Sequence, residues 1–277
     1  MSEISKSGHP YMVADWGQIE DPSEVHQVEE MIREAQPLDV YTQAELYDAA
    51  YPGYPGDKDF YVEYGRQGSV LYLGSGSGRI FGPIAESNPN AVGVDISSEM
   101  VTLMKQKFPG AAKNTVLLGD ASTLEYPNDT YDVVMAPYSF LQVIPEESLE
   151  RMLQSIRSTL KPGGRFVTDT FSSHIIPFRR PGIETMKFSP RENIQIQLFI
   201  TYNHIQQTMR EIAVVDDGAT RRATEMHLQY YFPRELARML KEAGLTPTSI
   251  NGDYSSEPFD PARHDIVVYE AERSPND

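Results

Sequence analysis

A glycine-rich segment and two aspartates have the residue types and spacing of a ligand-binding site. Gly74-Ser75-Gly76-Ser77-Gly78 follows a short apolar run and precedes an amphipathic one. Glycines permit a tight turn and let a ligand approach the main chain, and the start of the following helix presents free N–H groups. By itself, this pattern fits a structural turn as well as a cofactor loop.

The first aspartate, Asp95, ends the next apolar run, 17 positions beyond Gly78 (95 − 78). A carboxylate at this point is suited to accept hydrogen bonds from the two hydroxyls of a ribose. The alternative is that Asp95 caps the helix that follows, although Ser97 or Ser98 can take that role. The second aspartate, Asp120, follows a third apolar run in the same way.

These residues need a sheet to bring them together, and the apolar runs predict one. From Ser69 onward, short apolar runs alternate with amphipathic segments, as in a parallel sheet wrapped by helices. We predict strands at 70–73, 91–94, 115–118, 131–136 and 164–170. We predict helices between them at 80–87, 99–107 and 147–160. The expected fold class is therefore α/β, with a doubly wound sheet.

The remaining segments predict an N-terminal arm and a cover. Alternating residues between 184 and 232 indicate antiparallel strands, and a helix at 233–243 and a strand at 264–271 follow them. Helical spacing over 22–35 and the Pro/Gly turn at 52–56 indicate an arm before the core. We expect an arm and lid at 1–55, a core at 56–171 and 233–277, and a cover at 172–232. The lid is expected to order on ligand binding, and the cover is a candidate substrate wall and homodimer surface.

Composition excludes several classes of protein. With 24 Lys and Arg against 40 Asp and Glu, the formal charge is −16, which repels the phosphate backbone of a nucleic acid. The absence of cysteine removes disulfides and Cys-based metal sites, and no metal is expected. No apolar run approaches the roughly 18 residues of a membrane helix, and the first ten residues lack a signal-like apolar region. We expect a cytoplasmic protein without a membrane partner.

Taken in order, the motifs resemble those of class I S-adenosylmethionine (SAM)-dependent methyltransferases over residues 40–272. The glycine loop, Asp95 and Asp120 are followed by Tyr-Asp-Val-Val-Met-Ala-Pro-Tyr at 131–138 and Leu-Lys-Pro-Gly-Gly-Arg-Phe at 160–166. The resemblance implies a Rossmann-like, mostly parallel seven-stranded sheet that binds SAM and methylates a small molecule on nitrogen or oxygen. The 41–51 segment and the added antiparallel strands are similar to those of antibiotic amino-sugar N-methyltransferases.

The resemblance also implies roles for individual residues. The glycine loop contacts the methionine and ribose parts of SAM, through Gly74, Ser75, Gly76 and Gly78. Asp95 holds the ribose hydroxyls, and Asp120 recognises the adenine amine. Four further cofactor contacts are expected beside these aspartates, at Ile96, Met100, Ala121 and Ser122. Pro137 and Tyr138 are expected to face the reactive sulfonium.

One position departs from the family pattern. Members usually carry Asp or Glu two residues before the first glycine, where this chain has Tyr72. The usual acidic contact to the amino group of SAM is therefore missing. Loop carbonyls, Tyr41 or a neighbouring carboxylate are the alternatives for this contact.

The chemistry of transfer limits what catalytic residues must do. Methyl transfer from SAM is an in-line displacement on an activated carbon, so aligning the reactants and excluding water come first. A base is more useful for a hydroxyl acceptor than for an amine. Many relatives carry a His near position 142 or 143, where this chain has Gln and Val.

Any base must therefore come from another segment. The polar candidates are His174, His204, Glu225 and His227. We select His227, with Glu225 beside it on one face of a strand, and Tyr138 next to the sulfonium. The alternative for this strand is a solvated face over buried Met226, Leu228 and Tyr230.

Two other functions remain open from the sequence. An NAD(P)-dependent oxidoreductase shares the glycine loop and Asp95, but the loop lacks the third glycine of the dinucleotide fingerprint and Asp120 is left without a role. A catalytically silent SAM-fold binding protein is consistent with Tyr72. Binding of SAM against NADH, followed by a transfer assay, separates the three.

Overall fold

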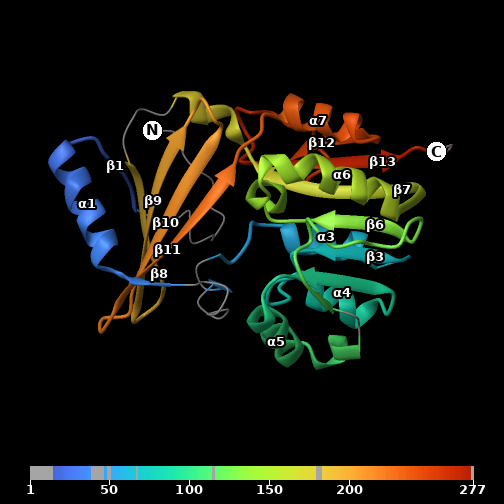
Figure 1. Cartoon of the computed structure of the whole chain (residues 1–277), viewed down its shortest axis with the longest axis horizontal. Coiled ribbons are helices and arrows are strands. Elements are labelled where there is room, and N and C mark those ends of the chain that lie inside the picture. Colours follow the sequence, from blue (N-terminus) through green and yellow to red (C-terminus); the bar gives the residue numbers. More distant parts are fainter. Residues whose placement is uncertain are drawn as a thin grey trace. The chain divides into compact units, whose positions relative to one another are not determined.

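The computed structural model describes residues 15–38, 47–48, 51–66, 68–113, 116–178 and 183–275. The chain divides into two compact units (Figure 1). The first contains Met1–Pro55 and Ile175–Tyr230, and the second contains Gly56–His174 and Tyr231–Asp277. The predicted division into an arm and lid, a core and a cover stays a prediction. Among the described residues, no helix is long and apolar enough to cross a membrane.

The second unit is built on a seven-stranded sheet in the order β12-β13-β7-β6-β3-β4-β5. Its strands are β3 (Val70–Leu73), β4 (Ala91–Asp95), β5 (Val116–Leu118), β6 (Tyr131–Ala136), β7 (Leu160–Phe171), β12 (Leu245–Gly252) and β13 (Ile266–Arg273). β3 to β7 pair in parallel, and β13 pairs antiparallel with both β7 and β12. The predicted Rossmann-like, mostly parallel seven-stranded sheet is therefore confirmed.

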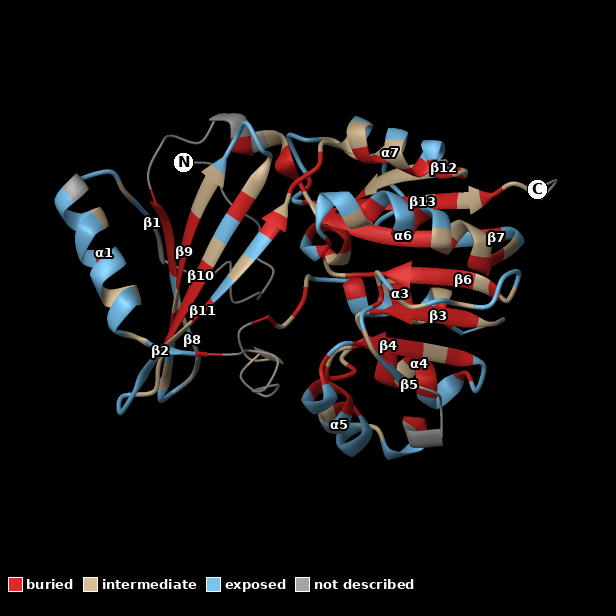
Figure 2. Cartoon of the chain, in the orientation of Figure 1, coloured by how far each residue is buried: buried red, intermediate tan, exposed pale blue. Residues whose placement is uncertain are grey.

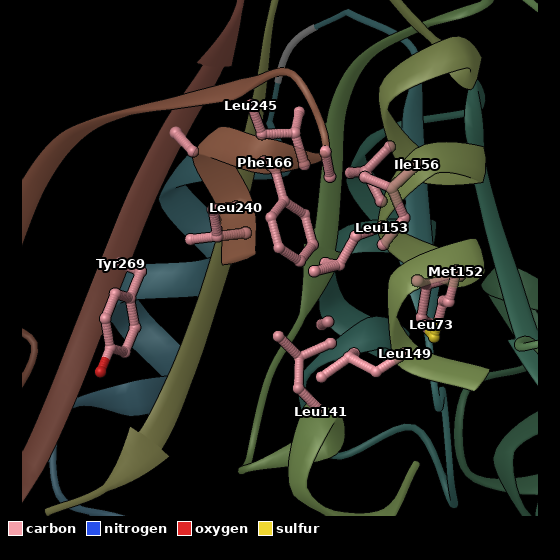
Figure 3. Packing of buried hydrophobic residues seen from close by; sticks show 14 of the residues in the cluster. Leu73, Leu141, Leu149, Met152, Leu153, Ile156, Phe166, Leu240, Leu245 and Tyr269 are labelled. Atoms are coloured by element: carbon pink, nitrogen blue, oxygen red, sulfur yellow. The ribbon is translucent and has the colours of Figure 1, made fainter. Parts of the chain in front are cut away.

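Helices cover both faces of this sheet because the strands are apolar on both sides. They are α3 (Asp57–Tyr64), α4 (Phe81–Ser87), α5 (Ser98–Lys107), α6 (Glu146–Thr159) and α7 (Pro233–Glu242). In β3, Leu71 and Leu73 belong to the core cluster that includes leucines of α6 and α7 (Figure 3). Val70 and Tyr72 belong to the cluster with α3, α4 and α5, as the two-residue period of a strand requires. α6 correspondingly has one buried and one exposed side (Figure 2).

The first unit is a six-stranded sheet in the order β1-β8-β9-β10-β11-β2. Its strands are β1 (Asp15–Ile19), β2 (Gln36–Pro37), β8 (Ile183–Arg191), β9 (Ile194–Asn203), β10 (Thr208–Asp216) and β11 (Arg221–Gln229). All neighbours pair antiparallel except β11 and β2. The antiparallel strands were predicted, whereas β1 and β2 were not.

One face of this sheet is covered by α1 (Pro22–Glu34). The helix begins as the sequence indicates, because the Asp21 carboxylate accepts a hydrogen bond from the Ser23 N–H at 2.7 Å. Val28 of α1 packs with Phe199 and Ile212 of the strands. Residues of β9 and β10 with the same parity as these two therefore lie on the α1 face.

Candidate functional site

The glycine loop after β3 leaves one open point on its main chain. Gly74, Gly76 and Gly78 all have positive φ, of 71°, 54° and 87°. A Cβ at Gly74 would lie 2.6 Å from the Phe140 ring and one at Gly78 would lie 2.3 Å from Met104, so packing excludes side chains there. A Cβ at Gly76 would meet nothing within 4 Å in the part of the chain that the structure describes. The loop can therefore admit a ligand to its backbone at Gly76.

The hydroxyl of Ser75 points to the same conclusion. Ser75 is 4% exposed, and within the described part of the chain its Oγ has no hydrogen-bond partner. A buried polar group without a partner is rare in native proteins, and a bound ligand is one way to satisfy it. The loop thus combines an open backbone position with an unsatisfied donor and acceptor.

Asp95 at the end of β4 is tied to the glycine loop. Its Oδ2 accepts from the Gly76 N–H at 2.6 Å and its Oδ1 from the Ser97 N–H at 2.9 Å. Burial raises the pKa of this carboxyl, while the backbone hydrogen bonds oppose the rise. Ser97 caps α5 by accepting from the Met100 N–H, so Asp95 is not needed as a cap. Each Asp95 oxygen keeps a lone pair for a further donor.

The next strand adds a carboxylate and an apolar surface. Asp120 is exposed after β5, where its Oδ1 accepts from the N–H and the hydroxyl of Ser122, both within 2.8 Å. Ile96 and Leu118 are large apolar side chains with 63% and 59% of their surface exposed, and Leu118 pairs with Asp95 across β4 and β5. Met100 and Ala121, two predicted contacts of the adenine, are buried. Leu118 was missed because an exposed leucine has no signal in the sequence.

The segment after β6 is held in an uncommon conformation. Pro137 is buried, and Tyr138 and Ser139 both have positive φ, of 59° and 56°. Such a conformation is uncommon for L residues and tends to occur at functional sites. The guanidinium of Arg79, from the end of the glycine loop, lies 5.5 Å from the centre of the Tyr138 ring. This contact joins the glycine loop to the segment that follows β6.

Arg79 also forms an ion pair that the sequence did not predict. It donates to both carboxylate oxygens of Asp57 at the start of α3, at 2.8 and 2.5 Å. The Asp57 side chain is 3% exposed and that of Arg79 is 28% exposed. A two-point contact of this kind fixes both side chains. It thereby attaches α3 to the glycine loop.

We expect Asp57→Asn to destabilise the fold by about 2–3 kcal/mol, because it removes the charge that compensates a largely buried guanidinium. Chemical denaturation measures the change. Glu63→Gln, which breaks the exposed ion pair between Glu63 of the same helix and Arg66, is the control and should cost no more than about 0.5 kcal/mol. Equal losses in the two variants would contradict this account of the buried pair.

Tyr72, at the position where the family resemblance led us to expect an acid, lies on the sheet face covered by α3 and α4. Burial raises the pKa of its hydroxyl, and Asp57, Asp169 and Asp95 raise it further, while Arg79 lowers it. These three carboxylates are therefore close enough to the Tyr72 hydroxyl to affect it electrostatically. Residue 72 is not acidic in this chain, but acidic side chains surround it.

Glu225 and His227 lie on β11, opposite Ile212 and Arg210 of β10, and hence on the α1 face of the six-stranded sheet. His227 is 70% exposed, with its Nε2 2.7 Å from a Glu225 carboxylate oxygen. Two hydrogen bonds from Arg210 lower the pKa of Glu225 most. These are the surroundings of a solvated face. The catalytic role of both residues stays a prediction.

The other face of this sheet also carries carboxylates. Ile200 of β9 pairs with Glu184 of β8 and with Glu211 of β10, so the three form one row across the sheet. The Tyr202 hydroxyl donates to Glu184 at 3.0 Å, and the Tyr51 hydroxyl donates to Glu211 at 2.8 Å. The sequence analysis did not select this row.

Several predicted positions are placed without being brought together. His174 bonds to the Ser172 hydroxyl in the second unit, whereas His204 approaches the Tyr230 hydroxyl in the first. Tyr41 lies outside the described residues. Among those that are described, no three His, Asp or Glu side chains gather as a metal site requires. The grouped residues are those at the carboxyl ends of β3, β4, β5 and β6.

Known methyltransferases are similar to this chain in sequence. Residues 70–164, which contain the glycine loop and both aspartates, match the model of a methyltransferase domain. The demethylmenaquinone methyltransferase of Clavibacter sepedonicus is 28% identical over 42% of this chain and 46% of its own length. The match thus spans less than half of that relative. The cypemycin N-terminal methyltransferase of a Streptomyces species is 26% identical over 72% of this chain and 81% of its own length.

Solved structures resemble nearly the whole chain. The CcbJ methyltransferase from Streptomyces caelestis has a TM-score of 0.74 and 23% identity, covering 83% of this chain and 96% of its own. SAM-bound CalS10, an amino pentose methyltransferase from Micromonospora echinaspora, has a TM-score of 0.61 and 17% identity, covering 87% and 99%. Residues 70–164 are therefore similar to a methyltransferase domain, and the chain shares its fold with these two methyltransferase structures.

Proposed function

We propose that this protein binds SAM at the carboxyl ends of β3 to β6 and transfers its methyl group to a small molecule. The observation that carries the proposal is the open backbone at Gly76, beside the Asp95 carboxylate and the unpartnered Ser75 hydroxyl. Ligands of open α/β sheets bind at this edge. The matching methyltransferase domain selects SAM among the ligands that such an edge can hold.

The described residues fit the parts of SAM. Asp95 accepts hydrogen bonds from the ribose hydroxyls through its remaining lone pairs, and Asp120 accepts one from the adenine amine. Ile96 and Leu118 offer the exposed apolar surface that a purine ring can cover. The contact to the methionine amino group, missing at Tyr72, passes to the carboxylate of Asp57.

SAM supplies a methyl carbon activated by a positive sulfur. The chain must then align the acceptor and exclude water, and no strong base is needed for an amine. Pro137 and Tyr138 form the wall beside the methyl group. The Arg79 guanidinium packs over the Tyr138 ring and fixes its position.

The relatives' names narrow the acceptor class. One relative is an N-terminal methyltransferase and one structural neighbour is an amino pentose methyltransferase. We infer methylation of nitrogen or oxygen on a small metabolite. Incubation with SAM carrying a labelled methyl group and a fractionated metabolite extract tests this. Transfer of label to a small molecule supports the proposal, whereas SAM binding without transfer to any fraction supports the silent binding protein instead.

Two variants distinguish base-assisted from proximity-driven transfer. We expect His227→Ala to keep most of the turnover, because the side chain is 70% exposed, whereas a positioned base contributes roughly a hundredfold or more. Tyr138→Ala should lose about tenfold or more, because it removes the aromatic wall at the methyl group. Initial rates at saturating SAM measure both. A large loss with His227→Ala alone would show that the base was correctly predicted from the sequence.

A further inference from the structure

Asp169, near the end of β7, is a fully buried carboxylate that the proposed chemistry does not use. Its Oδ2 accepts from the Tyr138 N–H at 2.8 Å, and its Oδ1 accepts from the Ser139 N–H at 2.7 Å. The Tyr61 hydroxyl of α3 donates to Oδ2 at 2.6 Å. One carboxylate thus accepts hydrogen bonds from two consecutive backbone amides and from a tyrosine hydroxyl of α3.

The two amides belong to the residues with positive φ. Tyrosine and serine favour this conformation far less than glycine does, so it persists only where the surroundings enforce it. Ser139 is tied a second time, because its Oγ accepts from the Phe171 N–H at 3.2 Å. The Asp169 carboxylate thus accepts a hydrogen bond from the N–H of each of these two residues.

We propose that Asp169 is a positioning residue, whose carboxylate holds the Tyr138–Ser139 turn in its left-handed conformation and so fixes the wall of the cofactor site. This inference rests on the proposed function. The turn carries the Tyr138 ring under the Arg79 guanidinium, which in turn is held by Asp57 of α3. Asp169 therefore acts through Tyr138 without contacting the reacting atoms.

The first test needs no methyl transfer. In Asp169→Asn, the amide can accept from only one of the two N–H groups, and its own N–H₂ faces the other. Hydrogen exchange of the Tyr138 and Ser139 amides should accelerate at least about tenfold, whereas Tyr61→Phe, which leaves both backbone bonds in place, should change it little. Unchanged exchange in folded Asp169→Asn would overturn the proposal.

A second test needs no variant. Burial raises the pKa of Asp169 to about 6, and the groups that act on it are Tyr61, Asp57, Tyr72 and the two amides. The amide resonances of Tyr138 and Ser139 should therefore shift together with a midpoint near pH 6. Amides that shift at two different midpoints would contradict the assignment, even if Asp169→Asn failed to fold.

Turnover then separates positioning from simple burial. Asp169→Asn should lower kcat about tenfold to a hundredfold, because small displacements of an aligned site have effects of this size. Adding Ser139→Gly, which accepts positive φ freely, should restore part of the loss. Absence of rescue together with normal amide exchange would overturn the positioning role. If the wild type transfers no methyl group while the amides behave as expected, the proposed function fails and the role of Asp169 in the turn stands.

Discussion

Replacing Asp95 by alanine is expected to weaken SAM binding about tenfold or more. The ribose hydroxyls would donate to a charged carboxylate, and hydrogen bonds to charged groups contribute roughly 1.5–3 kcal/mol. The variant also releases the Gly76 N–H that Asp95 now holds at 2.6 Å, which loosens the loop at its open point. Titration calorimetry with SAM measures the affinity.

The control must lose similar hydrogen bonds away from the site. Asp132, near the start of β6, accepts from the Ser69 N–H and from Lys161, both at 2.8 Å. It lies at the amino end of a parallel strand, opposite the edge where the ligand is proposed to bind. Asp132→Ala should lower stability while SAM affinity stays the same. Equal affinities for folded Asp95→Ala and the wild type would refute the ribose assignment.

Gly76→Ala should be at least as damaging to SAM binding, for a different reason. The new Cβ meets nothing within 4 Å among the described residues, but it occupies the space through which a ligand reaches the backbone. We expect about tenfold or weaker binding, with a modest loss of stability from the positive φ, of about 1–2 kcal/mol.

Gly218 provides a matched control in the turn between β10 and β11. It has a φ of 81°, and a Cβ there also meets no described residue within 4 Å. Gly218→Ala should therefore show a similar strain and unchanged SAM affinity. If both variants bind SAM as the wild type does, the ligand does not approach the loop at Gly76.

Local patterns were enough to predict the sheet and its helices. β3 and β6 have the bounds that their apolar runs indicated, α5 and α7 differ from the expected ranges by one residue at one end, and α6 differs by one residue at each end. Each of these signals is contained in a few neighbouring residues. By contrast, β1 and β2 are short polar strands whose pairing partners lie far along the chain, so no local pattern marks them.

The same reasoning explains which site residues were found. The glycine loop, Asp95 and Asp120 follow strands directly, and topology brings the ends of parallel strands together. Asp57, Asp169 and Leu118 were missed because their importance depends on contacts with distant residues, such as Arg79 and Tyr138. For Glu225 and His227, the two-residue period correctly placed both on one face. The period of the sequence does not show which face of the sheet α1 covers.

The central claim is that this chain binds SAM, and titration calorimetry of the wild type with SAM, using NADH in parallel, tests it most directly. We predict saturable binding of SAM at one site per chain and no binding of NADH, with the SAM heat reduced in Asp95→Ala and in Gly76→Ala but not in Gly218→Ala. Binding of NADH without SAM, or SAM binding that neither site variant alters, would contradict the account.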